Sequence, residues 1–219
     1  TGRSFGEFQQ YLSDFPVENL NIVIPHFHNT VMRFETFKKS VEQDLVNRKK
    51  AIQPWIDSYL QLEEIATRLY CLQKDGVLKL RVTHNDTKPS NVLFDKTTLA
   101  HLSVIDLDTV MPGSSLYDFG DAIRVIGSTG AEDEQDLSKV ALDMDKYEAF
   151  TRGFVGMLCG SMTQAEKDTL ALGAIAMTVE CGIRFLADYL NGDKYFKVHY
   201  PVAFYQSYYT VRADTFDYE

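Results

Sequence analysis

The β-like segments of this chain are too short to form a wide sheet, and this limits its fold more than any other feature. They cover residues 78–83, 92–94 and 102–105. Strands usually run for about five or six residues, and an independently stable sheet needs three or more strands. We therefore expect small β ribbons that hold the loops between them, within a domain whose framework is helical.

Apolar residues at helical spacing surround these ribbons. Predicted helices cover 33–52, 54–74, 118–126, 136–159 and 164–190. Pro54 fits the first turn of the second helix, and Asp75-Gly76 ends it because Gly tolerates the left-handed conformation of a helix terminus. Residues 127–134 are expected to form an exposed acidic loop. The predicted fold class is α+β, mainly α.

Length and composition indicate a single domain over residues 1–219. Of the 219 residues, 45% are apolar, which is enough to bury one substantial core. Charged residues make up 24%, which argues against intrinsic disorder. The net charge of −9 argues against nucleic acid as the main partner, because a protein that binds a phosphate backbone needs a basic face.

The cysteines and the apolar segments favour the cytoplasm. Cys71, Cys159 and Cys181 lie far apart and form no paired motif, which suits a reducing compartment. The longest strongly apolar stretch, 170–179, has ten residues, whereas a membrane-spanning helix needs about 20. No signal peptide opens the chain. We therefore expect a buried core helix at 170–179 and no membrane partner.

The segment 82–93, Val-Thr-His-Asn-Asp-Thr-Lys-Pro-Ser-Asn-Val-Leu, concentrates polar side chains in a short loop between two β-like segments. Asp86 and Asn91 are separated by four residues, as in the catalytic loop of kinases, where the Asp takes up a hydroxyl proton and the Asn binds a metal. Asp106 ends a β-like run fifteen residues beyond Asn91, and Asp108 follows it. This combination predicts phosphoryl transfer.

A kinase needs a divalent cation, because the transferring phosphoryl group spreads negative charge over its oxygens. Mg²⁺ prefers oxygen ligands and takes one or two carboxylates from the protein. Asn91 and Asp106 could supply an amide and a carboxylate oxygen. Asp86 would stay free of the metal as the base, and Lys88 could bind the transferring phosphate of ATP. Asp108 is either a second metal ligand or a carboxylate that caps the loop.

Turn chemistry alone offers a simpler explanation, because Asp and Asn are common in loops where they bond to nearby backbone. The kinase interpretation is favoured because the pattern includes an upstream His, an apolar triplet after Asn91 and a second acidic site after a strand. His84 is expected to be a structural residue beneath the loop, since a kinase already has its base in the Asp.

The segments 83–91 and 105–108 resemble the aminoglycoside phosphotransferase and choline kinase superfamily. The segments similar to its N-acetylhexosamine 1-kinase branch are 24–28, 84–88, 106–113, 117–124, 180–186 and 188–190. The resemblance covers about residues 5–198. It implies the large C-terminal lobe of a protein-kinase-like fold, which uses ATP and Mg²⁺ to phosphorylate the anomeric hydroxyl of an N-acetylated hexosamine.

The same resemblance implies a smaller β-rich lobe with a glycine-rich nucleotide loop and a phosphate-binding Lys. No strand-loop-strand pattern precedes Ile22, and Gly2 and Gly6 are isolated. We therefore expect that the N-terminal lobe is absent, that the chain is a fragment of a longer protein, and that it is inactive by itself. The segment 200–219 is rich in Tyr and Phe, where a more polar final helix is expected.

Glu180, Arg184 and Asp188 repeat at a spacing of four residues on the last long helix. One interpretation is a surface ladder of ion pairs. The alternative is a substrate site, because the resemblance places Arg184 at the sugar and phosphate end of the cleft and a guanidinium in apolar surroundings needs a specific partner. We expect Arg184 to bind substrate, and Asp188 to accept a hydrogen bond from Arg184 or from a sugar hydroxyl.

Two other motifs suggest metal sites but have simpler explanations. His26 and His28 have a chelating spacing, but no third ligand accompanies them. We expect loop packing for this pair, with sugar contact as the alternative. The sequence Asp118-Phe119-Gly120 resembles a kinase metal motif, but the carboxylates after 102–105 already fill that role by position. N-capping of a helix by Asp118 is therefore expected.

The resulting hypothesis is a kinase whose partners are ATP, a small-molecule sugar and an N-terminal lobe of the same protein. Within the same fold, the acceptor could instead be choline, an aminoglycoside or another sugar. In a different class of function, the chain would be a non-catalytic binding module. The presence of a nucleotide-binding lobe in the longer protein would discriminate between the enzyme and the module.

Overall fold

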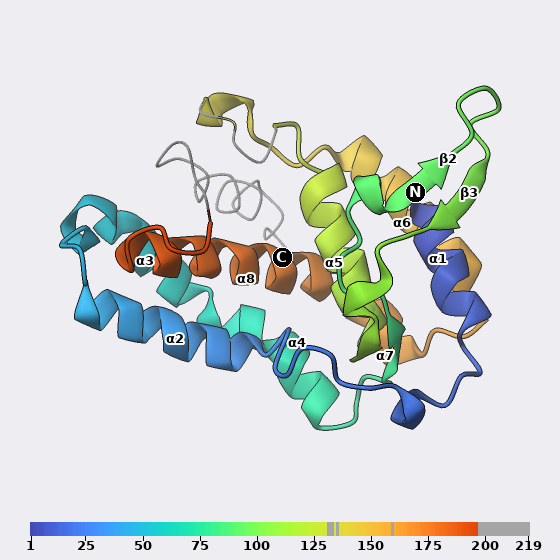
Figure 1. Ribbon diagram of the computed structural model, residues 1–219, viewed down its shortest axis with the longest axis horizontal. Helices are drawn as coiled ribbons and strands as arrows, with labels where there is room; N and C mark the ends of the chain where they lie inside the picture. The colour runs from blue at the N-terminus through green and yellow to red at the C-terminus, as the bar shows by residue number, and fades with distance from the viewer. Residues whose placement is uncertain (131–133, 135, 159, 197–219) are drawn as a thin grey trace.

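The computed structural model describes residues 1–130, 134, 136–158 and 160–196, and it is mainly helical with two small antiparallel ribbons (Figure 1). The α-helices are α1 (Gly2–Tyr11), α2 (Thr30–Gln43), α3 (Gln53–Gln61), α4 (Glu63–Lys74), α5 (Ser115–Ile126), α6 (Met144–Leu158), α7 (Gln164–Asp168) and α8 (Leu170–Leu190). The strands are β1 (Arg81–Thr83), β2 (Val92–Phe94), β3 (His101–Val104) and β4 (Met111–Gly113). The prediction of a mainly α fold with short β ribbons is confirmed.

Three features named from the sequence lie outside the described residues. They are the segment 200–219, Cys159, and residues 131–133 of the expected acidic loop.

Both ribbons consist of strands far too short for an isolated sheet. In the first, β1 pairs with β4 so that Arg81 faces Gly113 and Thr83 faces Met111. In the second, β2 pairs with β3, and Val92 faces Val104. The sequence Met-Pro-Gly of β4 was not predicted to be a strand, because Pro and Gly are both depleted in strands. Pairing with β1, and not the local sequence, therefore makes this segment a strand.

Several helix boundaries differ from the predicted ones. Helix α2 ends at Gln43 instead of continuing to Ile52, because Asp44 adopts a left-handed backbone conformation with φ of 39°. The Asp44 carboxylate then accepts the backbone N–H groups of Arg48 and Lys49 at 2.8 and 3.0 Å, which stabilises the turn. The predicted helix 54–74 is interrupted between α3 and α4, and α6 begins eight residues later than 136.

Helices α5 and α8 form the centre of the structure. Figure 1 shows α5 between α8 and the α1–α6 pair, while α2 and α3 lie at the opposite end. The backbones of α5 and α8 approach closely at Gly120 and Gly173, where a Cβ atom on either residue would overlap a carbonyl oxygen of the other helix. This close crossing fixes the position of α5, which carries the carboxylates described below.

Helix α8 is long and apolar enough to cross a membrane by length and composition. However, 61% of its most apolar window is buried inside the protein. Its buried face packs against α2, α4 and α5. This packing agrees with the predicted core helix at 170–179.

Candidate active site

The register of the β2–β3 ribbon brings two of the predicted metal ligands together. Because Val92 faces Val104, the preceding residue Asn91 and the following residues Ile105 and Asp106 meet at the same end of the ribbon. The N–H of Ile105 donates to the carbonyl oxygen of Asn91 at 3.0 Å. This hydrogen bond therefore joins the loop that ends at Asn91 to the loop that carries Asp106, fifteen residues further along the sequence.

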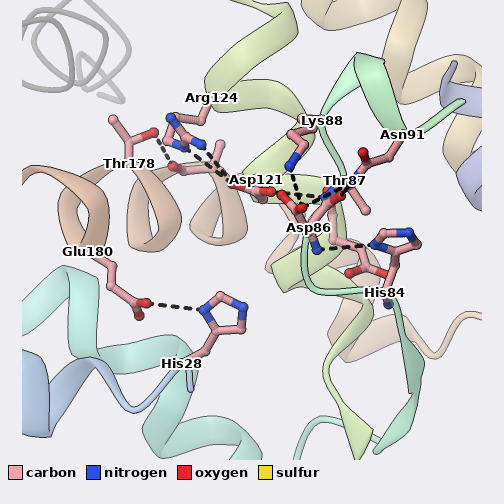
Figure 2. Close-up of polar contacts among 12 residues, drawn as sticks. His28, His84, Asp86, Thr87, Lys88, Asn91, Asp121, Arg124, Thr178 and Glu180 are labelled. Carbon is pink, nitrogen blue, oxygen red and sulfur yellow. Dashed lines mark hydrogen bonds and ion pairs between the residues drawn. The ribbon is translucent and has the colours of Figure 1, made fainter. Parts of the chain in front are cut away.

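Asp86 lies beside this junction, in the loop between β1 and β2 (Figure 2). The Asn91 side-chain amide donates to the Asp86 Oδ2 at 3.0 Å and to its backbone carbonyl at 2.9 Å. The ammonium group of Lys88 lies 2.6 Å from Asp86 Oδ2 and 3.8 Å from Asp106 Oδ2. The structure thus brings together Asp86, Lys88, Asn91 and Asp106, and we call these four residues the Asp86 cluster.

Charge within the Asp86 cluster is arranged around Lys88. The hydrogen bond to Asp86, followed by the attraction of nearby carboxylates, raises the pKa of Lys88 above its usual value. The Asp86 side chain is 31% exposed and that of Asp106 is 48% exposed, so both are accessible to a ligand. A protonated lysine between two accessible carboxylates is suited to binding a phosphate group close to a base.

The donor set of the Asp86 cluster fits Mg²⁺, which prefers oxygen ligands and usually takes only one or two carboxylates from the protein. Because its Nδ2 donates to Asp86, the Asn91 side chain directs Oδ1 away from Asp86 (Figure 2). Asp106 would supply the carboxylate. Within the described residues, no group of three or more His, Cys, Asp or Glu side chains could hold a metal. A cation here would therefore need oxygens from phosphate or water.

Asp108 is not joined to the Asp86 cluster. It is exposed, and no hydrogen bond or ion pair connects it to Asn91 or Asp106 in the described part of the chain. It lies in the 3-10 turn Leu107–Thr109 that follows Asp106. Its role as a second metal ligand remains a prediction.

His84 lies beneath the loop, as predicted, and is fully buried. Its Nε2 donates to the carbonyl oxygen of Ile105 at 2.9 Å, and the N–H of Asp86 donates to its Nδ1 at 3.3 Å. This pattern requires the neutral tautomer with the proton on Nε2. The imidazole therefore joins the two loops and has no free nitrogen for proton transfer.

Asp118 does not cap helix α5, so that prediction is wrong. Helix α5 begins after Ser114, whose Oγ accepts the N–H of Leu116 at 3.3 Å. Asp118 is instead fully buried, and its carboxylate accepts the backbone N–H groups of His84 and Asn85 at 2.9 and 2.7 Å. Burial raises the pKa of Asp118 above its usual value, although these hydrogen bonds act in the opposite direction.

Asp121 holds the backbone on the C-terminal side of Asp86. Its Oδ2 accepts the backbone N–H of Thr87 at 3.0 Å, while its Oδ1 pairs with the guanidinium of Arg124 at 3.1 Å. The Thr87 hydroxyl in turn donates to the backbone carbonyl of Asp118 at 2.6 Å. Two carboxylates one helical turn apart thus fix the backbone on both sides of Asp86. The sequence signal for this shared role is the spacing of three residues between Asp118 and Asp121, since it places both carboxylates on one face of a helix.

Among the described residues, Arg184 makes neither the alternative surface ladder with Glu180 and Asp188 nor the expected hydrogen bond to Asp188. Asp188 accepts the backbone N–H groups of residues 194–196 at 2.8–3.1 Å and thereby stabilises the turn after α8. The Arg184 guanidinium lies over the ring of Phe196 at 5.5 Å and that of Tyr195 at 5.9 Å. Among the described residues, no ion pair links Arg184 to either acidic residue or to the Asp86 cluster.

Glu180 faces the N-terminal segment of the domain. It is 1% exposed, and its carboxylate pairs with His28 Nδ1 at 3.1 Å and accepts the Thr30 hydroxyl at 2.9 Å. Burial alone would raise its pKa, but His28 and Thr30 lower it below the usual value. His28 therefore packs the loop before α2 onto α8, as expected for loop packing, while His26 is exposed.

Comparison with known proteins agrees with the geometry of this site. The model of the phosphotransferase enzyme family (APH) matches residues 26–150, which is more than half of the 219 residues. The matched range contains the Asp86 cluster, both ribbons and the α5 carboxylates. The chain therefore belongs to the phosphotransferase enzyme family.

Proposed function

We propose that this protein transfers the γ-phosphoryl group of ATP to a hydroxyl of a small molecule, with Asp86 as the base. The observation that carries the proposal is the position of Lys88, 2.6 Å from Asp86 and 3.8 Å from Asp106. A positive charge lies between two accessible carboxylates, which the proposal makes the base and the metal ligand. The family supports a phosphotransferase in general, and the finer assignment rests on these contacts.

In the proposed mechanism, Asp86 accepts a hydrogen bond from the substrate hydroxyl and takes its proton as the oxygen attacks phosphorus. Asn91 donates to Asp86 and so orients the carboxylate. Lys88 stabilises negative charge on the transferring group as a point charge. Asn91 Oδ1 and Asp106 would hold Mg²⁺, which when bound neutralises charge on the phosphate oxygens.

We propose the C1 hydroxyl of an N-acetylhexosamine as the acceptor. The motifs that resemble the N-acetylhexosamine 1-kinase branch support this choice. In this proposal Arg184 binds the sugar or the developing charge, and Asp188 acts by holding the turn that carries Tyr195 and Phe196. Choline, an aminoglycoside or another sugar is the alternative acceptor.

We further propose that nucleotide binding requires a lobe outside this chain. Residues 1–22 form helix α1, a 3-10 turn at Val17–Asn19 and connecting loops, without a strand-loop-strand unit for phosphate. The 219 residues alone should therefore show no measurable phosphoryl transfer. Robust turnover by the isolated chain would contradict this part of the proposal. In the proposal the complete protein is cytoplasmic, where ATP is available.

The experiment is a phosphorylation assay of the complete protein with ATP, Mg²⁺ and a panel of hexosamines, hexoses and amino alcohols. Transfer to C1 of an N-acetylhexosamine, lost in Asp86→Asn, would support the proposal. Transfer to choline or an aminoglycoside would correct the substrate alone. A protein that binds a sugar but transfers no phosphate to any acceptor would be a non-catalytic binding module, and the proposed function would be wrong.

A further inference from the structure

Helix α1 packs beside the catalytic loop, although it lies outside the residues 26–150 that the family model matches. Figure 1 shows α1 alongside α6 and next to β3, and both contact it. A Cβ atom on Gly2 or Gly6 would overlap a backbone carbonyl oxygen of α6, that of Phe150 or Phe154, so the two helices approach closely. This crossing fixes the position from which the side chains of α1 reach the loop.

Gln9 joins α1 to the carboxylate that holds the catalytic loop. It lies on the buried face of α1 and is only 2% exposed. Its Nε2 donates to Oδ2 of Asp118 at 2.6 Å, across 109 residues of sequence. The same oxygen accepts the backbone N–H of His84 at 2.9 Å, and Oδ1 accepts the backbone N–H of Asn85 at 2.7 Å. Among the described residues, Gln9 is therefore the only side chain that donates a hydrogen bond to this carboxylate.

Two aromatic side chains of α1 pack against His84. The rings of Phe5 and Phe8 meet the imidazole edge to face, at centroid distances of 5.6 and 5.7 Å. Such contacts between rings are favourable and depend on orientation. His84 in turn joins the catalytic loop to Ile105. Residues 5–9 of α1 therefore contact both His84 and the carboxylate that fixes its backbone.

The Gln9 amide has a cost that packing alone does not explain. Its Oε1 is buried without a hydrogen-bond partner in the described part of the chain, and an unpaired buried acceptor is unfavourable. Burial raises the pKa of the Asp118 carboxyl group, and the hydrogen bond from Gln9 is one of three that lower it. No Lys or Arg of the described residues pairs with Asp118, so its charge depends on these three donors.

We propose that Gln9 is a positioning residue for phosphoryl transfer. Gln9 orients the Asp118 carboxylate. Asp118 fixes the backbone of the two residues before Asp86, and that backbone directs the Asp86 side chain. No hydrogen bond joins Gln9 to the Asp86 cluster within the described residues, so it acts through Asp118. The inference rests on the proposed function, with Asp86 as the base, and goes beyond it by giving α1 a part in the reaction.

The first test compares Gln9→Met with Gln10→Met in the complete protein. Met has a length and a helix preference similar to those of Gln, but it cannot donate to Asp118. Gln9→Met should lower kcat about tenfold and leave KM for ATP and for the acceptor nearly unchanged, because the base is displaced. Gln10 Oε1 accepts the Ser161 hydroxyl at 3.1 Å, so Gln10→Met loses a hydrogen bond that does not involve Asp118 and should keep its kcat. An unchanged kcat in Gln9→Met would overturn the proposal.

A double-mutant cycle tests whether Gln9 acts through Asp118. If it does, Gln9→Met should cause little further loss of kcat when Asp118→Asn is already present, because both changes disturb the same contact. Two losses that multiply in full would show that Gln9 acts independently of Asp118, and the proposal would be wrong.

Amide hydrogen exchange, measured by NMR, tests the contact without activity. In Gln9→Met the backbone amides of His84 and Asn85 should exchange faster relative to those of α8, whereas a general loss of stability would speed exchange in both places. In the unmodified protein, the side-chain amide of Gln9 should exchange more slowly than that of exposed Gln43. Equal rates for the two glutamines would overturn the proposal, even if every Gln9 variant failed to fold. If the unmodified protein transfers no phosphate, the proposed function is wrong, and these exchange rates still decide whether Gln9 holds the loop.

Discussion

The carboxylate of Asp118 accepts the backbone N–H of Asn85 at 2.7 Å, across 33 residues of sequence. Asn85 has a left-handed backbone conformation with φ of 64°, which non-glycine residues adopt at some cost. The hydrogen bond fixes this conformation immediately before Asp86. Helix α5 therefore sets the direction in which the Asp86 side chain projects from the loop, although α5 carries none of the predicted catalytic residues.

Replacing Asp118 with Asn should destabilise the protein and misplace Asp86. The amide nitrogen cannot accept a hydrogen bond, so at least one of the buried N–H groups of His84 and Asn85 loses its partner. The cost of such a group is about 1–3 kcal/mol in the free energy of unfolding. Urea unfolding of the variant measures this loss, and the kcat of the complete enzyme should fall as well.

Asp14→Asn is the matched control for this experiment, because Asp14 is exposed. It should change the free energy of unfolding by less than about 0.5 kcal/mol. If Asp118→Asn were as stable as this control, Asp118 would not hold the catalytic loop.

The sequence predicts the Asp86 cluster because local spacing carries that information. Asp86 and Asn91 lie within one loop, and the short apolar segments after Asn91 and before Asp106 pair as a ribbon. The role of Asp118 depends instead on where α5 lies in the folded chain, which the close approach of Gly120 and Gly173 decides. A glycine in a helix does not by itself show which helix it faces.

The same distinction explains the other differences between prediction and structure. Asp188 has the spacing of an ion-pair ladder, but the turn after α8 offers it three backbone N–H groups. Strand β4 has a sequence unsuited to strands, but β1 provides a partner. In each case a contact with another segment of the chain overrides the preference that the pattern suggests.

The roles of base and metal ligand can be separated by substitution in the complete enzyme. Asp86→Asn should leave the binding of Mg²⁺ and ATP nearly intact and lower kcat about 100-fold or more, because it removes the base. Asn91→Ala and Asp106→Ala should instead raise the Mg²⁺ concentration needed for half-maximal activity. Steady-state kinetics with a Mg²⁺ titration distinguishes the two effects.

Asp108→Ala is the informative companion variant, since no hydrogen bond or ion pair joins Asp108 to the Asp86 cluster among the described residues. If Asp108→Ala needs the same Mg²⁺ concentration as the unmodified enzyme, Asp108 only caps the loop. If it needs a higher Mg²⁺ concentration, Asp108 is a second metal ligand. Loss of Mg·ATP binding in Asp86→Asn would reverse the assignment of base and ligand.

The buried pair of Arg81 and Glu166 should make stability depend on pH. Arg81 donates to both Glu166 oxygens at 2.6 and 2.8 Å. Burial alone would raise the pKa of Glu166, but the hydrogen bonds of Arg81 and Thr163 lower it below its usual value. A glutamate in the unfolded chain titrates at about 4.3, so the unfolded state binds the proton first as the pH falls. The stabilisation is therefore complete above about pH 5 and is lost progressively below it.

Comparison with Glu166→Gln measures this contribution. The difference in the free energy of unfolding between the two proteins should be constant from pH 6 to 7 and should shrink below about pH 5. Chemical unfolding at a series of pH values provides the data. A difference that grew as the pH fell would mean that the pKa of Glu166 is raised in the folded protein.

Arg184 provides the sharpest test of the substrate class. If its guanidinium binds the acceptor sugar, Arg184→Ala should lower kcat/KM for the sugar roughly 30- to 1,000-fold, as expected for a lost charge-assisted contact, and leave ATP binding nearly unchanged. Arg184→Lys should restore only part of the activity, because an ammonium group lacks the planar fork that makes two parallel hydrogen bonds. Steady-state kinetics with varied sugar and varied ATP separates the two effects.

Arg48 is the control for the structural role of Arg184. Its guanidinium also lies over an aromatic ring, 4.5 Å from the centroid of Tyr189, and it pairs with Asp193. If Arg184 only packs against Tyr195 and Phe196, Arg184→Ala and Arg48→Ala should both cost about 1 kcal/mol or less in stability and leave kcat/KM unchanged. If Arg184 binds substrate, only Arg184→Ala loses activity. A near-normal Arg184→Ala enzyme would therefore remove the main sequence argument for a sugar over choline.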